Sequence, residues 1–551
     1  MSRVRLGSVI AAAISLAAAM PCAAAAPSAS PGFVVEDAIP GFHIEAPVAL
    51  AFTPDGRLLV ADVPGRIWVI QNGVQIPTPM WAHETEVETN GDCGLLGFAL
   101  DPQFATNRYI YLLYSVDPDS NGVDDDTLHF GRLTRYQVSA SDPDRIDEST
   151  RTILLGTSFT DGIPNASGTH AVGCLRFGSD GTLLVSAGEG SHWNGVDAGG
   201  RDPDLFAPGR VDPSQDRGAF RARMLGSLAG KVLRLDPATG HGVPSNPFYS
   251  GSGTDPASKV WAFGLRNPFR FSVRSGTGST VPAVGDPGVL YIGDVGWEQW
   301  EELDVARTGG RDFGWPCSEG ARENTPYANL APLMGTCADP SSWTRPAMAI
   351  SHLWADSSDP AGLRGNSITA GPFYTHTQFP SLWRGRLLFA DFYRGWIRAA
   401  TFNGLQQYVS TDELATGMQG PVDLAIEPAT GWLYVACIID DRVRRIRWAP
   451  TAAVEPTSTP GIAFGPARPN PARGEVTFDL ELTATGAIAF EVLDVTGRLV
   501  WREDLRSLPS GEHPLRWRGH DLQGRAQPAG VYLARVRTHS AEYRQRCVWL
   551  Q

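Results

Sequence analysis

The chain of 551 residues lacks the sequence signs of several protein classes. It has no CxxC pair and no Cys/His cluster with zinc spacing, which argues against a zinc site. After residue 26, no apolar run approaches the roughly 18 residues of a membrane-spanning helix. Positive charge is in deficit, and the formal net charge of -13 argues against a nucleic-acid backbone or an anionic membrane surface as partner. Long helical periodicity is nearly absent, which favours an all-β fold.

The N-terminus has the pattern of a cleaved export signal. Arg3 and Arg5 precede an apolar run and an Ala-rich stretch that ends near Ala26. We therefore predict a signal peptide over residues 1–26 and a periplasmic, cell-surface or secreted mature protein. Six cysteines follow, and export permits disulfides. Cys317 and Cys337 flank a Pro/Gly-rich loop and are expected to pair.

One short sequence motif, called a phrase below, recurs six times along the chain. It consists of a Gly-bearing turn, a short apolar β-run, a polar turn and often a second β-run. Six such phrases predict a six-bladed β-propeller over residues 33–448, with long loops on one face where binding sites collect. An array of β-sandwiches with similar turns is the alternative. The six phrases lie at 54–62 with 65–70, 107–114, 179–187, 288–294, 384–391 with 395–398, and 429–435 with 442–447.

The composition and the hydrophobic pattern of the sequence change after the last phrase. Residues 449–463 begin with a Pro-, Thr- and Ala-rich stretch that predicts an extended linker. Residues 464–551 contain alternating runs separated by Gly-bearing turns, which predict a small β-sandwich of the immunoglobulin type.

A histidine stands at the start of one predicted strand. His170 lies immediately before a predicted strand that runs into the Ser-Asp-Gly turn at 179–181, and the next strand is expected at 182–186, so we expect His170 at a strand entrance beside a loop. A general base is often displayed there, although a structural imidazole is the alternative. The loop after this hairpin, 188–197, is expected to line a site in which Glu189, Trp193 and Asp197 contact the ligand.

Five stretches together resemble the soluble quinoprotein sugar dehydrogenases, the glucose/sorbosone dehydrogenase family that uses pyrroloquinoline quinone (PQQ). They occur in the family's order and cover most of residues 33–448. The stretches are 91–104, 168–181, 228–236, 261–268, and 293–297 through 314–316.

The resemblance implies oxidation of the C1 hydroxyl of an aldose sugar to a lactone, with hydride transfer to PQQ and reoxidation by an external electron acceptor. His170 matches the family's base, and a neutral imidazole suits proton removal near pH 7. Arg266 matches the arginine that polarises the quinone together with Ca²⁺, and its neighbour Asn267 is expected at the cofactor. The Ca²⁺ would bind main-chain carbonyls in the loop that matches Gly296 and Trp297.

The sequence also departs from the family. Thr169 stands where soluble glucose dehydrogenase has Asp before the histidine, so Asp92 is expected to supply the missing carboxylate. The lysine and arginines that neutralise the carboxylates of PQQ lack clear counterparts, and Arg394 and Arg364 are the candidates. The alternative is a non-catalytic carbohydrate- or protein-binding propeller that has lost the cofactor. A propeller lactonase would instead need a central cluster of metal-ligating carboxylates.

Two further expectations follow from the resemblance. Cys93 adjoins Asp92 and Cys174 follows His170, so a Cys93–Cys174 disulfide would join the two halves of the site, with two buried free thiols as the alternative.

The last domain resembles the flagellar-hook-capping type of immunoglobulin-like module, also seen as a C-terminal sorting domain. This implies contact with the cell surface or secretion machinery, or a spacer role. The carriers of the resemblance are 469–471, 492–498, 517–521 and 528–532.

Overall fold

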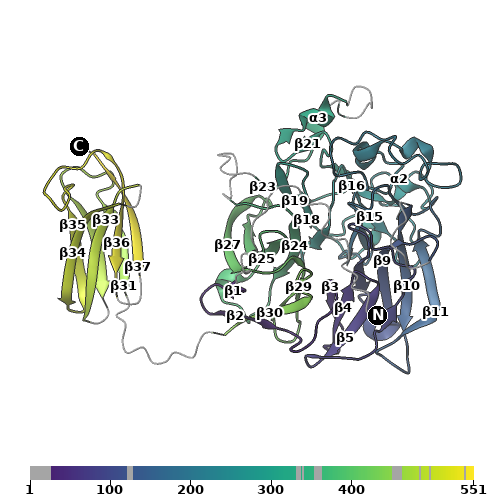
Figure 1. Cartoon of the computed structure of the whole chain (residues 1–551), viewed down its shortest axis with the longest axis horizontal. Coiled ribbons are helices and arrows are strands. Elements are labelled where there is room, and N and C mark those ends of the chain that lie inside the picture. The colour runs from purple at the N-terminus through teal and green to yellow at the C-terminus, as the bar shows by residue number, and fades with distance from the viewer. Residues whose placement is uncertain are drawn as a thin grey trace, which may run out of the picture. The chain divides into compact units, whose positions relative to one another are not determined.

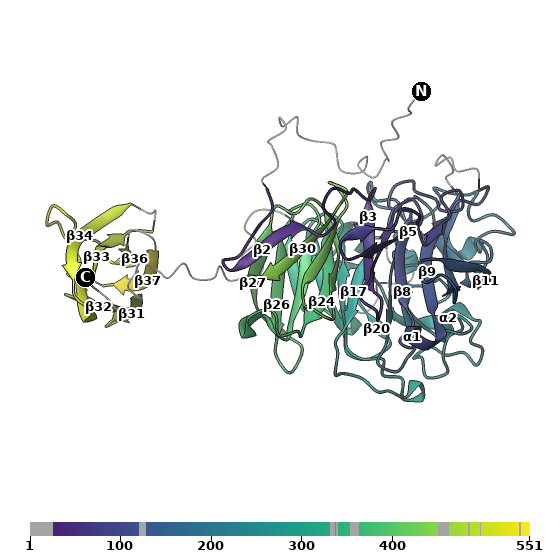
Figure 2. The same cartoon turned by 90° about the horizontal axis from the view of Figure 1, so that it is seen from below.

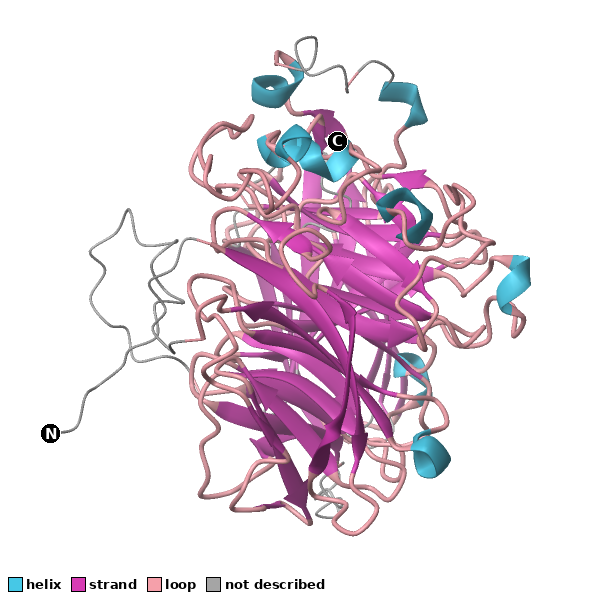
Figure 3. Ribbon diagram, turned by 90° about the vertical axis from the view of Figure 1, so that its right-hand side faces the viewer, coloured by secondary structure: helices cyan, strands magenta, loops and turns pink. Residues whose placement is uncertain are grey.

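The computed structural model describes residues 26–120, 128–330, 337, 340–352, 363–449, 462–482, 485–495, 498–538 and 542–550. Internal contacts divide the chain into two units, Met1–Ala449 and Pro450–Gln551. Most of the predicted export signal and most of the predicted linker lie outside the described residues. Strands form the body of the protein and helices are few and short (Figure 3), so the predicted all-β class is confirmed.

Within the described residues, the first unit contains six sheets of four or five strands, which follow one another around the unit (Figure 1). All pairings are antiparallel except β16 with β20. The first three sheets are β3 (Pro47–Phe52), β4 (Leu58–Asp62), β5 (Arg66–Gln71), β6 (Val74–Gln75) and β7 (Trp81–Ala82); β8 (Leu95–Leu100), β9 (Tyr109–Val116), β10 (His129–Val138), β11 (Ile146–Leu155) and β12 (Ile163–Asn165); and β13 (Val172–Phe177), β14 (Leu183–Ala187), β15 (Lys231–Leu235), β16 (Val260–Phe263) and β20 (Arg311–Asp312).

The other three sheets complete the circuit of the first unit. They are β17 (Arg270–Val273), β18 (Leu290–Asp294), β19 (Trp300–Ala306) and β23 (Met348–Ser351); β24 (Ile368–Tyr374), β25 (Arg386–Asp391), β26 (Ile397–Phe402), β27 (Tyr408–Thr416) and β1 (Ser28–Ala29); and β28 (Pro421–Ile426), β29 (Leu433–Cys437), β30 (Arg442–Trp448) and β2 (Phe33–Asp37). A separate short hairpin is formed by β21 (Ser318–Glu319) and β22 (Arg322–Glu323).

The recurring phrase of the sequence explains these sheets. Gly56 has a φ of +89°, and the turn that contains it is closed by a hydrogen bond from the N–H of Gly56 to the carbonyl of Thr53. The following strand, β4, is buried along its whole length. A strand that is apolar on both faces must pack against neighbours on both sides, and here the two faces meet the adjacent sheets.

The six sheets close into a ring. Their first strands contact one another in the cyclic order β3, β8, β13, β17, β24, β28 and back to β3. The N-terminal strand β2 pairs with β30, from Phe33 opposite Trp448 to Asp37 opposite Arg444, and the two strands lie side by side in Figure 2. Asp37 also forms ion pairs with Arg442 and Arg444. A closed ring of such sheets defines a β-propeller.

Helices occur only in connections. The residues between β14 and β15, 188–230, form a long excursion that contains two short 3₁₀ helices. No described helix has both the length and the apolar character needed to cross a membrane. The helices are α1 (Phe104–Asn107), α2 (Pro256–Lys259) and α3 (Thr325–Ala328), and the 3₁₀ turns are η1 (Pro213–Gln215), η2 (Gly218–Arg223), η3 (Pro282–Val284), η4 (Pro340–Ser342) and η5 (Ser381–Trp383).

The second unit has its own core between two antiparallel sheets. Residues of β32 alternate between buried and exposed positions, so one face of this strand contributes to the core and the other faces solvent. One sheet contains β31 (Ile462–Arg468), β32 (Val476–Leu482) and β35 (Gly511–Trp517), and the other contains β34 (Leu499–Leu508), β33 (Gly486–Leu493), β36 (Gly530–Arg537) and β37 (Glu542–Trp549).

The cysteines confirm one predicted disulfide and correct the other. Cys317 and Cys337 are bonded, with 5.8 Å between their Cα atoms. Cys93 and Cys174 are free and buried, so the predicted bond between them is wrong. The thiol of Cys93 is directed to the carbonyl of Gly168, whereas that of Cys174 is directed to the carbonyl of Phe271, each at 3.9 Å. The two side chains therefore point to different neighbours.

Candidate functional site

A cavity of about 240 Å³ lies among loops of the first unit. His170 and Arg266, which are far apart in sequence, both line it, as the prediction required. Four further predicted site residues are also in the lining: Asp92, Asn267, Trp193 and Gly296. The cavity therefore brings an imidazole and a guanidinium together with room between them for a small molecule.

His170 is paired with a buried carboxylate. Its Nδ1 lies 2.6 Å from Oε1 of Glu189, which is completely buried. Since the carboxylate can only accept, Nδ1 carries the hydrogen of this bond, and in the neutral form of the imidazole the lone pair then lies on Nε2. Ser191 donates its hydroxyl to the second oxygen of Glu189. Burial alone would raise the pKa of Glu189, but the hydrogen bond from His170, the nearby charges of His170 and Arg266, and the Ser191 hydroxyl hold that pKa below its usual range.

The backbone of His170 is held from both sides. Its φ is +50°, a left-handed conformation that is uncommon for a residue with a side chain. The N–H of His170 donates to Oδ2 of Asp92 at 3.2 Å, and its carbonyl accepts from the N–H of Gly190 at 3.2 Å. At Gly188, a Cβ would lie only 2.1 Å from the carbonyl oxygen of His170, so this position requires glycine.

These contacts correct two predicted roles. Asp92 was expected to orient the imidazole, but its carboxylate accepts the main-chain N–H of His170 instead. Glu189 was expected to contact the ligand, yet it lies behind His170 and is the partner of the ring. The position of Glu189 directly after a predicted strand indicated that it belongs to the site loop, but the sequence could not indicate which way its side chain points. Asp197 is also buried and accepts main-chain N–H groups of His192 and Gly199.

Close contact between two loops fixes Asp92. Gly91 has a φ of +66°, and a Cβ there would lie 2.3 Å from the carbonyl oxygen of Gly168. The same carbonyl accepts the N–H of Asp92 at 2.7 Å. The loop before β8 and the loop before β13 therefore support each other directly beneath the cavity.

Arg266 is fixed on another side of the cavity. Its Nη1 donates to the carbonyls of Val295 and Gly296 at 3.0 and 2.6 Å. Its main-chain N–H donates to Asp294 at 2.9 Å, and its carbonyl accepts the N–H of Glu189 at 2.8 Å. The last bond joins the arginine segment directly to the segment that holds the carboxylate partner of His170.

The remaining predicted residues have different surroundings. Trp297 does not line the cavity, and its indole N–H donates to the main-chain carbonyl of Trp193. Trp193 lines the cavity and is 41% exposed. Arg394 and Arg364 do not line the cavity either. Arg394 is exposed, and its main-chain N–H donates to Asp391.

Arg266 is therefore the single Lys or Arg among the described lining residues. The chain has two lysines, Lys231 and Lys259, and both are buried elsewhere. The side of the cavity near Arg394 instead offers the neutral polar residues Asn366, Ser367 and Thr369.

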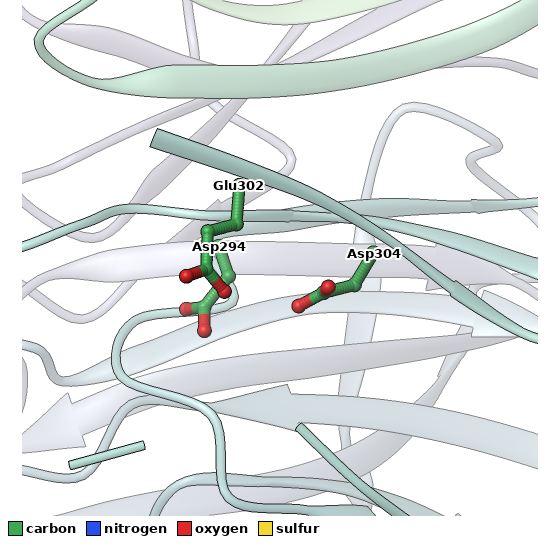
Figure 4. A group of neighbouring side chains, drawn as sticks. All are labelled: Asp294, Glu302 and Asp304. Atoms are coloured by element: carbon green, nitrogen blue, oxygen red, sulfur yellow. The ribbon is translucent and has the colours of Figure 1, made fainter. Parts of the chain in front are cut away.

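Figure 4 shows a separate group of three buried carboxylates, Asp294, Glu302 and Asp304. One oxygen from each lies within 4.8 Å of the others, an arrangement of ligand atoms that hard divalent cations prefer. Asp294 also accepts the main-chain N–H of Arg266. Burial raises the pKa of Asp294 to about 7 and raises those of Glu302 and Asp304 well above the usual range. None of the three lines the cavity, so the group is not the central cluster that a lactonase would need.

The geometry defines a β-propeller with an imidazole and a guanidinium in one cavity, and comparison with known proteins identifies the family. Residues 44–445 match the model of the glucose/sorbosone dehydrogenase family, and the chain belongs to that family. Residues 469–542 match the FlgD Ig-like domain, as the sequence of the last unit predicted.

Several curated proteins are similar to this chain. The HIPL1 protein of Arabidopsis thaliana is 27% identical over 381 residues, which cover 62% of this chain and 48% of that protein. The aldose sugar dehydrogenase YliI of Escherichia coli (strain K12) is 25% identical over 280 residues, covering 50% and 59%. Quinoprotein glucose dehydrogenase B of Acinetobacter calcoaceticus is 24% identical over 290 residues, covering 52% and 53%. The chain thus spans about half the length of the curated relatives it matches.

Solved structures support the fold. A glucose dehydrogenase-type oxidoreductase from Thermus thermophilus aligns with a TM-score of 0.52 and 24% identity, over 75% of this chain and 99% of that chain. The apo form of the soluble aldose sugar dehydrogenase from Escherichia coli aligns with a TM-score of 0.52 and 20% identity over the same shares.

Proposed function

We propose that this protein oxidises the C1 hydroxyl of an aldose sugar to a lactone, using PQQ as hydride acceptor together with Ca²⁺, and passes the electrons to an external acceptor. The observation that carries this proposal is the shared cavity of His170 and Arg266. Membership of the glucose/sorbosone dehydrogenase family supports it, as do relatives described as aldose sugar dehydrogenase and quinoprotein glucose dehydrogenase.

The lining fits the quinone end of PQQ. Arg266 can place positive charge near a carbonyl oxygen, Asn267 adds an amide donor, and the carbonyl of Gly296 offers the type of oxygen that Ca²⁺ prefers. The carboxylates of the cofactor would be received by the neutral donors of Asn366, Ser367 and Thr369 rather than by a second cation. When bound, PQQ supplies the two-electron acceptor that no amino-acid side chain provides.

The chain's own residues would handle the proton and the developing charge. Nε2 of His170 has the lone pair that accepts the proton of the sugar hydroxyl, because Glu189 holds the hydrogen on Nδ1. The ionised carboxylate of Glu189 stabilises the imidazolium that results. The fixed charge of Arg266 would stabilise negative charge that develops near it in the cavity. Trp193 offers an exposed aromatic face on which a sugar ring can stack.

We further propose that the six sheets are the blades of a six-bladed propeller, and that the second unit is an immunoglobulin-like sandwich that mediates cell-surface or secretion-machinery contact. The closed order of first strands supports the blade count, and the match to the FlgD Ig-like domain supports the second assignment. Export to the periplasm, cell surface or medium is proposed from the signal-like residues 1–26.

The function is tested by reconstituting the protein with PQQ and Ca²⁺ and measuring dye reduction with a panel of aldoses. His170→Ala should lower kcat by at least about 100-fold, because the general base contributes roughly two to four orders of magnitude. His513→Ala, in the second unit, is the matched control and should retain wild-type turnover. PQQ binding, followed by absorbance titration, should be similar in all three proteins. Equal turnover in His170→Ala and wild type would refute the assignment of the base.

A further inference from the structure

A buried arginine contacts the turn that carries Glu189. Arg221 lies in η2, within the excursion between β14 and β15, and is 1% exposed. Its Nη2 donates to the carbonyl of Gly190 at 3.0 Å, and its Nε donates to the carbonyl of Glu189 at 3.3 Å. The guanidinium also lies over the ring of Phe206, with 5.0 Å to the ring centre. One planar group therefore reaches two successive carbonyls directly behind the partner of His170.

A second buried basic side chain holds the segment of Arg221. Nζ of Lys231 donates to the carbonyls of Arg221, Ala222 and Ala229 at 3.1, 2.7 and 2.7 Å. Lys231 is completely buried on β15, the strand next to β14, and β14 leads directly into Glu189. The hydrogen bonds thus run from β15 through Arg221 to the turn of Glu189 and from there to the ring of His170.

The partners of Arg221 differ from those of a structural arginine on the neighbouring strand β15. Arg234, on β15, is paired with the carboxylate of Asp180 at 2.6 Å. Among the described residues, no carboxylate lies within ion-pair distance of Arg221, whose partners are main-chain carbonyls. A buried charge without a contacting counter-ion is unfavourable by several kcal/mol unless nearby opposite charge offsets it. The completely buried carboxylate of Glu189 is such a charge, and burial lowers the pKa of Arg221 although this carboxylate and others act against it.

We propose that Arg221 is a positioning residue, which holds the turn at Glu189 and Gly190 under His170 and supplies the positive charge that offsets the buried carboxylate of Glu189. Lys231 fixes Arg221 in turn. The kinetic part of this inference rests on the proposed dehydrogenase function, whereas the titration of His170 does not.

The charges around the pair determine the direction of the effect. Glu189 and Arg266 lie close to His170, Asp92 binds its main chain, and Tyr327 is near Glu189. Arg221 faces the carboxylates of Glu189, Asp197, Asp216 and Asp202. Removing the guanidinium takes one positive charge away from the surroundings of the buried carboxylate of Glu189 and leaves Arg266 as a cation that acts on it. The pair should then take up a proton at a higher pH than in the wild type.

Two substitutions separate charge from geometry. Arg221→Met removes both, and Arg221→Lys keeps the charge but loses the fork that reaches two carbonyls. In Arg221→Met, the midpoint of the His170 imidazole titration, measured by NMR on cofactor-free full-length protein, should rise by about one pH unit. In Arg221→Lys, the midpoint should stay within about 0.3 pH unit, while the downfield resonance of the Nδ1 hydrogen weakens or disappears because the short bond to Glu189 loosens.

The reconstituted enzyme provides a second readout. The acid limb of the pH dependence of kcat/KM should move up by about one unit in Arg221→Met and stay in place in Arg221→Lys, in which kcat falls about tenfold with KM unchanged. Arg57→Met is the control, because Arg57 is buried in the turn before β4, where it binds the carbonyl of Pro143 and pairs with Asp55 and Asp144, and it is not among the residues that line the cavity. It should lose stability without moving the titration midpoint.

Two outcomes would overturn the inference. One is an unchanged titration midpoint in folded Arg221→Met. The other, which decides the matter if Arg221→Met does not fold, is an Arg221→Lys protein with the wild-type Nδ1 resonance. If PQQ and sugars give no dye reduction with any variant, the proposed function fails, but the two NMR results still decide the role of Arg221.

Discussion

The pair of His170 and Glu189 leads to a quantitative prediction for Glu189→Gln. In this variant the amide oxygen can still face Nδ1, because the hydroxyl of Ser191 can rotate to accept from the new NH₂ group. The substitution therefore removes the charge and keeps the hydrogen bond. Hydrogen bonds to charged groups contribute about 1.5–3 kcal/mol and neutral ones about 0.5–1.5 kcal/mol, a difference of about 1–1.5 kcal/mol. Glu189→Gln should thus lower kcat about tenfold.

Glu189→Ala removes the hydrogen bond as well and leaves Nδ1 without its partner, so kcat should fall about 100-fold. The acid limb of the pH dependence of kcat/KM should move to lower pH in both variants, because the imidazolium loses the negative charge that stabilises it. This direction is opposite to the one expected for Arg221→Met.

Initial rates of dye reduction at saturating acceptor, measured from pH 5 to 9, test both variants. Glu491→Gln is the matched control, since Glu491 is also buried but pairs with Arg502 and Arg535 in the second unit. The reasoning is refuted if Glu189→Ala retains wild-type kcat, or if the acid limb moves to higher pH in either variant.

Two further predictions concern stability. Burial lowers the pKa of His129 to about 4, so the unfolded chain, with its His near 6.5, binds the proton first. The free energy of unfolding is therefore unaffected by His129 above pH 6.5 and decreases by up to about 3 kcal/mol as the pH falls from 6.5 towards 4. In His129→Phe, urea unfolding should show a smaller decrease over this range. Parallel plots of the free energy of unfolding against pH for the two proteins would contradict the prediction. Gly91→Ala should destabilise the protein by more than Gly56→Ala and also lower activity, because both glycines have positive φ but only at Gly91 does the new Cβ meet a backbone atom, at 2.3 Å. Equal shifts of Tm in the two glycine variants would show that the close contact is not limiting.

Much of the propeller could be predicted because its signals are local. The phrases predicted at 54–62, 179–187 and 288–294 contain the buried strands β4, β14 and β18. Their Gly-bearing turns depend on backbone preferences that neighbouring residues determine. The predicted bounds 33 and 448 coincide with the pair Phe33 and Trp448, which joins the ends of the propeller sequence.

The site was predicted less completely, since side-chain direction is not a local property. His170 and Arg266 were assigned to one cavity through the family motifs that carry them, and both line it. The motifs did not show that Arg364 and Arg394 lie outside the lining while their neighbours Asn366 and Tyr393 lie within it.

The sequence by itself determined the class of fold and the order of strands and turns, and its family motifs indicated the imidazole and the guanidinium that line one cavity. The tertiary structure alone decided which carboxylate meets the imidazole, and that Cys93 and Cys174 stay unpaired. The physical reason is the backbone at His170. Its positive φ and its bonds to Asp92 and Gly190 orient the ring towards Glu189, and these constraints exist only once three loops have packed together.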